Sequence, residues 1–73
     1  MKQKELEKEL KKAGIPENLY NLDGTGRTDE RFCLENINNK WYVYFIERGI
    51  KTLNEEFESE DGACQFIYKQ LLD

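Results

Sequence analysis

Six apolar or aromatic residues follow one another at positions 41–46, in the stretch WYVYFIERG, before the first charged side chain appears. Side chains of a β-strand point alternately to its two faces, so a strand formed here is apolar on both faces. The chain has 73 residues, which are too few to cover both faces of a sheet with its own helices. The second face of this strand is therefore the first place to look for a contact beyond the core.

A tight turn before this run determines how the strand pairs. Asparagine tolerates positive φ, so Asn38-Asn39 predicts a two-residue hairpin loop between RFCLEN and the apolar run. The resulting cross-strand pairs are Leu34 with Val43, Phe32 with Phe45, and Cys33 with Tyr44. Trp41, Val43 and Phe45 then share the predicted core face with Phe32 and Leu34.

A second reversal is predicted after the run. Glu47-Arg48-Gly49 fits a three-residue hairpin loop whose last residue, Gly49, takes the left-handed conformation. This loop pairs Val43 with Leu53. The outer face of the sheet is then expected to carry Tyr42, Tyr44, Ile46, Cys33, Glu35, Ile50, Thr52 and Asn54, exposed to solvent in the monomer.

A helix is predicted at each end of the chain. In KQKELEKELKKAG, Leu6, Leu10 and Ala13 recur on one helical face, and Gly14 is a typical C-terminal stop. Ser59 is a typical N-cap for the last helix. The side of this helix that packs on the sheet is expected to carry Ala63, Phe66, Ile67 and Leu71, with Cys64 and Tyr68 at its edge.

The segment between the first helix and the hairpins is less regular. Tyr20 and Leu22 indicate a short edge strand before the turn-rich DGTG. The two glycines lack the GxxxxGK[ST] pattern of a phosphate-binding loop. We expect this segment to be a flexible connection.

Together these elements predict one α+β domain over residues 1–73: an N-terminal helix, an antiparallel meander of three to four strands, and a C-terminal helix. Both helices should pack on one face of the sheet and form two layers with it. The residues expected to be buried together are Trp41, Val43, Phe45, Leu34, Phe66 and Ile67.

Charge and hydrophobicity restrict the compartment and the partner. The net charge is −4, which argues against a nucleic-acid binder, since such proteins need a basic face. No run is long enough to span a membrane, and the lysine-rich start lacks the apolar segment of a signal peptide. Cys33 and Cys64 form no CxxC pair and are expected to be free thiols. A cytoplasmic location is therefore expected.

A second candidate surface is acidic. Five acids fall within positions 55–61, namely Glu55, Glu56, Glu58, Glu60 and Asp61. They could meet a basic partner, or they could be a solvated turn leading into a helix, where acids favour the N-terminal dipole.

The composition does not favour an enzyme. The chain has no histidine, so the commonest general base and the commonest zinc ligand are both missing. Two isolated cysteines make neither a nucleophile–base pair nor a metal site. No catalytic residue, cofactor or metal site is predicted.

KWYVYFIERG followed by FESEDGACQFIYKQL resembles the pattern of small immunity proteins from bacterial polymorphic-toxin systems. The matching residues are Trp41, Glu47, Arg48, Gly49, Phe57, Ser59, Glu60, Ala63 and Cys64. The resemblance implies a cytoplasmic inhibitor that binds a cognate toxin and blocks it, without naming the contact residues. The two candidate surfaces are Tyr42, Tyr44 and Ile46 on the outer sheet face, and the acids Glu55, Glu56 and Glu58.

Two alternatives stay open. A homodimer or adaptor module that uses the outer sheet face fits every residue above. A double-stranded RNA-binding domain shares the α-β-β-β-α order, but here the last helix begins with Ser59, Glu60 and Asp61, which would repel phosphate.

Overall fold

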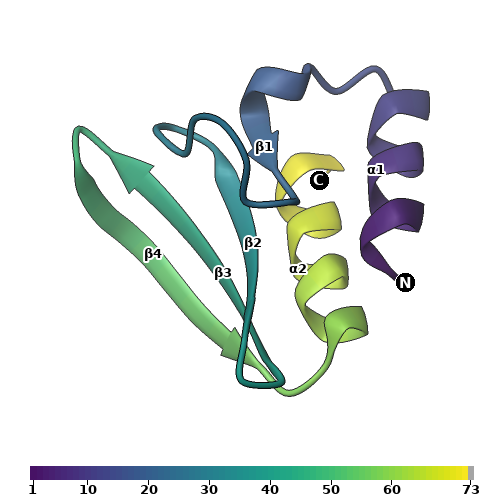
Figure 1. The fold of residues 1–73 in the computed structure, drawn as a ribbon. Coiled ribbons are helices and arrows are strands. Elements are labelled where there is room, and N and C mark those ends of the chain that lie inside the picture. The colour runs from purple at the N-terminus through teal and green to yellow at the C-terminus, as the bar shows by residue number, and fades with distance from the viewer. Residues whose placement is uncertain (73) are drawn as a thin grey trace.

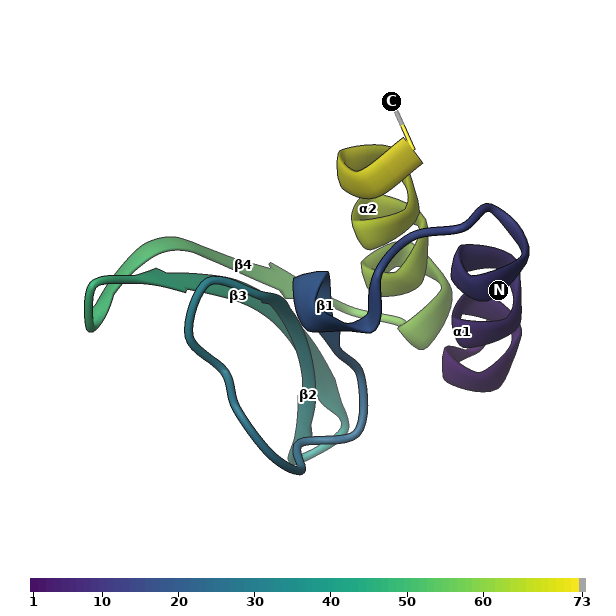
Figure 2. The same ribbon diagram turned by 90° about the horizontal axis from the view of Figure 1, so that it is seen from above.

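The computed structural model describes residues 1–72, which form a four-stranded sheet and two helices in two layers (Figures 1 and 2). The elements are α1 (Gln3–Lys12), a 3₁₀ turn η1 (Glu17–Leu19), β1 (Tyr20–Asn21), β2 (Phe32–Ile37), β3 (Lys40–Glu47), β4 (Ile50–Phe57) and α2 (Glu60–Leu72). Both helices lie on the same side of the sheet, with α2 between α1 and the strands. The predicted α+β class and the placement of the two helices are confirmed.

The sheet has the order β1-β2-β3-β4. Strands β2, β3 and β4 form the predicted antiparallel meander. The edge strand β1 is present as predicted, but it runs parallel to β2, so the sheet is mixed rather than wholly antiparallel. Parallel neighbours need a long connection, and the loop of residues 22–31 supplies it.

The first hairpin has the predicted register. Asn38 and Asn39 both take positive φ (51° and 67°), as a two-residue loop of the type favoured in hairpins requires. The three predicted cross-strand pairs between β2 and β3 are confirmed. The asparagine pair therefore determines which side chains of β3 face the core.

The second hairpin differs from the prediction. Its loop has two residues, Arg48 and Gly49, both with positive φ (52° and 79°), and Glu47 already pairs with Ile50. A bulge between Phe45 and Ile46 then shifts the pairing, so that Phe45 lies opposite Leu53. The bulge keeps Leu53 on the core side, where an unbroken register would have turned it outward.

The shift in strand pairing changes the neighbours that were expected for residues of β4. The predicted pairing of Val43 with Leu53 is wrong, because Val43 lies opposite Glu55. Lys51 lies on the outer face, with its Nζ 4.5 Å from the centroid of the Tyr44 ring. The expected outer-face residue Ile50 lies beside the loop and is 66% exposed.

The core lies between the sheet and α2 and extends to α1. Its buried members are Leu6, Leu10, Tyr20, Leu22, Leu34, Val43, Ala63, Cys64 and Ile67. Cys64 is fully buried as a member of this cluster, rather than at the edge of the packing side of α2 as predicted. Of the residues expected to be buried together, Leu34, Val43 and Ile67 are buried, whereas Trp41 and Phe66 are half-buried against them.

Phe45 is the exception among the expected core residues. It is half-buried and packs on Phe32, with ring centroids 5.0 Å apart, outside the buried cluster. The end of the β3–β4 hairpin projects beyond the two helices (Figure 2), so the helices give Phe45 little cover. The sequence pattern predicts on which face of the sheet a side chain lies. It does not predict how much of that face the helices cover.

Ser59 caps α2 as predicted. The backbone N–H of Gly62 donates to the Ser59 hydroxyl oxygen at 3.1 Å. A Cβ placed on Gly62 would lie 3.4 Å from that oxygen and 3.5 Å from the Phe57 ring, which are ordinary contact distances. Close approach to the sheet therefore does not require glycine at this position.

We expect Gly62→Ala to stabilise the protein. Alanine is about 0.5–1 kcal/mol better than glycine within a helix, and no side chain has to move to admit the methyl group. Urea denaturation should show a higher midpoint with an unchanged slope. Gly14→Ala is the matched control, because Gly14 has a φ of +78° and alanine should destabilise the protein there. A loss of stability in Gly62→Ala would contradict this account of the α2 start.

Candidate functional site

The outer face of the sheet, opposite the helices, carries the aromatic residues predicted as a binding surface. Tyr42, Tyr44 and Ile46 are half-buried rather than open as predicted. The loop of residues 22–31 lies on the side of β2 away from the helices (Figure 2). Part of the second face of β3 is thus covered by a segment of the same chain.

Cys33 shows where this loop touches the sheet. Its side chain belongs to the outer face, yet it is only 1% exposed. The thiol lies 3.6 Å from the carbonyl oxygen of Thr28 and 3.5 Å from that of Arg31. At the end of the loop, the N–H of Glu30 donates to the carbonyl oxygen of Ile46 at 2.6 Å. The loop therefore covers the outer face around Cys33 and Ile46. The part of that face that stays available lies toward Tyr42.

The strand register places charged groups beside the tyrosines. Tyr42 lies between Glu35 of β2 and Glu56 of β4, and Tyr44 lies between Cys33 and Asn54. Lys40 donates to a carboxylate oxygen of Glu56 at 3.0 Å. We use the name tyrosine face for the group Tyr42, Tyr44, Glu35, Glu56, Lys40 and Lys51.

The acidic segment 55–61 does not form a surface of its own. Glu56 joins the tyrosine face, whereas the adjacent Glu55 pairs with the core-facing Val43 and belongs to the opposite side. Glu58 lies 3.8 Å from Lys40. The two remaining acids contact the start of α1, where a carboxylate oxygen of Glu60 accepts from the N–H of Gln3 (2.8 Å) and Asp61 pairs with the Met1 amino group. Of the six predicted site residues, Tyr42 and Glu56 lie directly opposite each other, and Tyr44 and Ile46 follow Tyr42 along the same face of β3.

Three ionisable groups on or beside this face have raised pKa values. Burial raises the pKa of the Tyr44 phenol, and the neighbouring Cys33 raises it further. Burial also raises the pKa of the Cys33 thiol. The hydrogen bond to Glu56 raises the pKa of Lys40. Tyr44, Cys33 and Lys40 therefore stay protonated at neutral pH.

Both thiols should react slowly in the folded protein. Burial raises the pKa of Cys33, and it raises the pKa of Cys64 to about 11. The sheet separates Cys33 on the outer face from Cys64 in the helical layer, which excludes a disulfide between them. At pH 8 we expect iodoacetamide to modify both only after denaturant is added, as measured by intact mass. Rapid modification of the native protein would contradict their burial.

The raised pKa of Cys64 predicts that the stability of the folded protein depends on pH in the alkaline range. The pKa of Cys64 is higher in the folded state than its ordinary value of 9.0, so the unfolded chain releases this proton first. The protonated Cys64 thiol makes its full contribution to the folding stability below pH 9. This contribution decreases as the pH rises toward about 11.

Asn21 is a structural residue that the sequence reasoning missed. It is 5% exposed, and its amide nitrogen donates to the carbonyl oxygens of Thr25 and Arg27, both at 2.8 Å. Its amide oxygen accepts from the N–H of Gly24 at 2.9 Å. The predicted flexible DGTG connection is therefore a loop held by a buried side chain. Asparagine close before Asp-Gly is a turn signal that could have indicated this arrangement.

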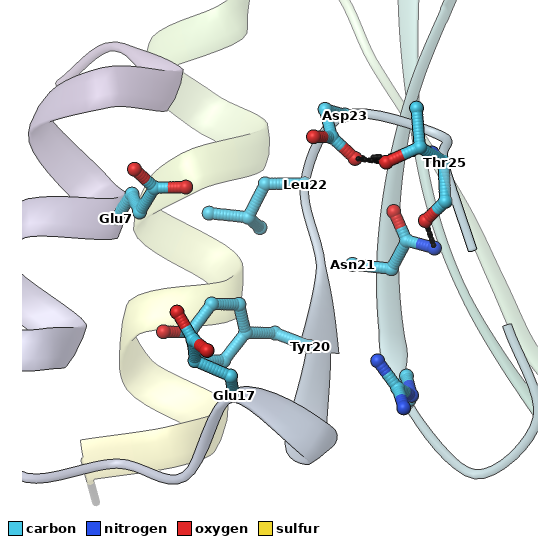
Figure 3. A pocket seen from close by; sticks show the side chains of 8 residues that line it. Glu7, Glu17, Tyr20, Asn21, Leu22, Asp23 and Thr25 are labelled. Atoms are coloured by element: carbon cyan, nitrogen blue, oxygen red, sulfur yellow. Dashed lines mark hydrogen bonds between the residues drawn. The ribbon is translucent and has the colours of Figure 1, made fainter. Parts of the chain in front are cut away.

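A small recess lies beside β1, between α1 and the start of the loop (Figure 3). Its volume is about 170 Å³, and its lining residues are Glu7, Glu17, Tyr20, Asn21, Leu22, Asp23, Thr25 and Arg31. Tyr20 is 6% exposed, and within residues 1–72 its hydroxyl oxygen has no hydrogen-bond partner. Burial raises the pKa of this phenol, and the neighbouring Glu17 adds to the effect.

Tyr20→Phe should leave the protein at least as stable as the parent. Within residues 1–72 the buried hydroxyl has no hydrogen-bond partner, so its removal takes away a desolvated polar group and none of the hydrogen bonds of that part of the chain. Thermal unfolding should show an equal or higher midpoint. A clear decrease would mean that the hydroxyl has a stabilising partner in solution.

No group of side chains in the described part of the chain is suited to hold a metal ion. Within residues 1–72, no helix has the length and apolar character needed to cross a membrane. No protein-family model, curated protein or solved structure matches the chain. The surfaces described above are therefore the basis for a functional proposal.

Proposed function

We propose that the chain is a cytoplasmic immunity protein, which binds a bacterial toxin domain and neutralises it by direct contact. The tyrosine face would be the centre of the contact. The resemblance of the Trp41–Gly49 strand and the Phe57–Cys64 segment to small immunity proteins supports this assignment. The chemistry of the face supports a binding role, since Tyr44 and Lys40 stay protonated and Lys40 is paired with Glu56.

The observation that carries the proposal is the composition of the face opposite the helices. Tyr42 and Tyr44 lie next to each other on this face, with carboxylates on both sides of Tyr42. Tyrosine offers a large contact area with a polar tip, and it is enriched among the residues that dominate binding energy. A surface of this kind suits a protein partner better than a small molecule, because it has no deep cavity.

The net charge of the chain favours a partner with basic side chains, whereas the two lysines of the tyrosine face balance its two glutamates. Glu35 and Glu56 lie beside Tyr42, and the chain as a whole carries a net charge of −4. Opposite charge accelerates encounter and disfavours wrong partners. A basic toxin domain, such as a nuclease, would meet this requirement.

The test begins with the neighbouring reading frame, which should encode a large secreted protein that ends in a small toxic domain. Expression of that domain should stop bacterial growth, and co-expression of this chain should restore it. The purified pair should form a complex in size-exclusion chromatography. Failure of the parent chain to bind or protect would refute the immunity assignment.

Two controls address the alternatives. Sedimentation of the purified chain alone distinguishes a monomer from a homodimer built through the tyrosine face. A mobility-shift titration with duplex RNA at low salt should show no saturable binding, because Glu60 and Asp61 occupy the first turn of α2. Saturable micromolar binding would favour the RNA-binding alternative.

A further inference from the structure

We propose that the far end of β2, with a recess beside it, is a docking site for an extended segment of the partner protein. The segment adds a strand to the sheet where β1 stops, and it alternates apolar with basic side chains. The name open edge is used below for residues 34–37 of β2. The inference rests on the proposed function for the identity of the partner, whereas binding of an extended peptide can be measured without it.

The first argument is the shortness of β1. It pairs with β2 no further than Cys33, while β2 continues to Ile37. After β1 the chain turns away, so the rest of β2 has no strand beside it on that side (Figure 1). Among the backbone–backbone hydrogen bonds that residues 1–72 make outside their helices and strands, none involves residues 35–37. The sheet therefore has room for one more strand at this place.

The register of the first hairpin shows which backbone groups are free there. Pairs of an antiparallel ladder alternate between those that exchange both backbone hydrogen bonds and those that exchange none. Ile37 and Lys40 flank the two-residue loop and exchange both. Asn36 therefore directs its N–H and its C=O away from β3, toward the place of the missing strand. Since Asn36 is exposed, an added strand can reach both groups.

The second argument is the recess at the place of the missing strand. It lies between β2, the turn of residues 22–24 and Gln3 of α1, and its volume is about 360 Å³. This volume is within the range of about 300–1,000 Å³ typical of ligand pockets. Trp41, the partner of Asn36 across the hairpin, lines the recess and is only half-buried. An apolar side chain of the added strand can therefore pack on Trp41.

The third argument is the charge beside the open edge. The two charged residues that line the recess, Asp23 and Glu35, are both acidic and exposed. Within residues 1–72 neither takes part in an ion pair. Glu35 and Ile37 share the outer face of β2, and Ile37 is 46% exposed. A lysine on that side of the added strand can lay its apolar stem on Ile37 and its charge beside Glu35.

The other free edge of the sheet is less suited to this role. β4 contains the bulge opposite Phe45 and Ile46 and carries Lys51, Glu55 and Glu56. Bulges and charged side chains are the means by which edge strands avoid pairing with other chains. The open edge pairs with β3 in an unbroken register and has one charged residue, Glu35. An incoming strand therefore joins β2 rather than β4.

The experiment titrates the isotope-labelled protein with capped Lys-Val-Lys-Val-Lys peptide and follows the backbone amides and the indole N–H by NMR. We expect saturable shifts at Gly24, Asn36 and Trp41. The same peptide with its three central residues N-methylated keeps the side chains but loses the N–H groups that pair strands, and it should produce none. A Glu-Val-Glu-Val-Glu peptide should bind at least about tenfold more weakly, because like charges repel.

Three results would contradict the proposal. Equal binding of the N-methylated peptide would overturn the addition of a strand. Equal binding of the glutamate peptide would overturn the basic character of the segment. Shifts confined to β4 would overturn the assignment to β2.

Two exposed isoleucines provide matched variants. Ile37→Lys places a positive charge on the open edge and should weaken binding of the lysine peptide about fivefold, since like charges on neighbouring strands repel. Ile50→Lys makes the same change on β4, at a side chain that is 66% exposed, and should leave binding unchanged. Equal losses in the two variants would overturn the assignment.

A third variant tests the backbone contact itself. Asn36→Pro removes the N–H that the added strand needs, at a position where the ladder with β3 does not use it. Binding of the lysine peptide should be lost, while circular dichroism should show the same fold. A folded Asn36→Pro variant that binds like the parent would overturn the proposal. If this variant does not fold, the comparison of Ile37→Lys with Ile50→Lys decides.

The peptide result is independent of the toxin assay. If the peptide binds the open edge but the chain does not neutralise the neighbouring toxin, the proposed function fails while the docking site stands. If the toxin is neutralised and Ile37→Lys neutralises it equally well, the open edge is not part of that interface and the proposed partner is wrong. A homodimer that Ile37→Lys dissociates would identify a second copy of the chain as the occupant instead.

Discussion

Ile67→Ala should destabilise the protein by about 2–5 kcal/mol, because truncation of a fully buried aliphatic side chain leaves a cavity. Ile67 lies on α2, the element between the sheet and α1, and is fully buried. For a domain of this size the total stability is about 4–11 kcal/mol, at roughly 0.05–0.15 kcal/mol per residue. The variant should therefore unfold at a temperature lower by at least about 10 °C.

The measurement is urea denaturation of Ile67→Ala beside two controls. Phe45→Ala removes a larger side chain that is only half-buried, outside the core cluster, and should cost less than Ile67→Ala. Ile50→Ala changes a residue that is 66% exposed and should alter stability by no more than about 0.5 kcal/mol. Should Phe45→Ala prove the most harmful of the three, the helices must cover the β3–β4 hairpin more fully than Figure 2 shows.

The parts of the fold that local chemistry determines could be predicted from the sequence. Asn38-Asn39 requires a two-residue loop with positive φ, and this loop alone fixes the register between β2 and β3. Gly14 and Ser59 mark helix ends by the same kind of local requirement. Each of these predictions depends on residues that are close together in the chain, and each is confirmed.

The second hairpin could not be predicted in the same way. Arg48-Gly49 forms a two-residue loop, although arginine is an uncommon residue at positive φ. The pairing shifts at a bulge, which has no signal in the local sequence. The burial of Leu53 on the core side is a tertiary requirement, and satisfying it overrides the simpler register.

The candidate site likewise has features that the sequence predicts and features that it does not predict. Alternation along β3 correctly places Tyr42 and Tyr44 on the face away from the helices. It could not show that the loop of residues 22–31 returns to cover Cys33, since that depends on the parallel pairing of β1 with β2. Alternation along β4 likewise puts Glu55 and Glu56 on opposite faces, so residues 55–61 do not form one acidic surface.

That separation makes possible a sharp test of the proposed function. Glu55 and Glu56 are adjacent residues of β4 and carry the same charge, yet Glu56 lies beside Tyr42 on the tyrosine face while Glu55 lies on the opposite side. Reversal of each charge in turn changes the net charge equally. Any difference between the two variants therefore reports which face meets the partner.

We expect Tyr42→Ala to weaken binding of the neighbouring toxin domain by about 30-fold or more, as truncation of a central interface tyrosine does. Glu56→Lys should also weaken binding and slow association, because it places a positive charge beside Tyr42 and opposes a basic partner. Glu55→Lys should bind like the parent. Surface plasmon resonance gives both rate constants, and circular dichroism verifies that each variant is folded. If Glu55→Lys weakens binding while Glu56→Lys and Tyr42→Ala do not, the interface lies on the helical side of the β3–β4 hairpin, and the tyrosine face is not the site of neutralisation.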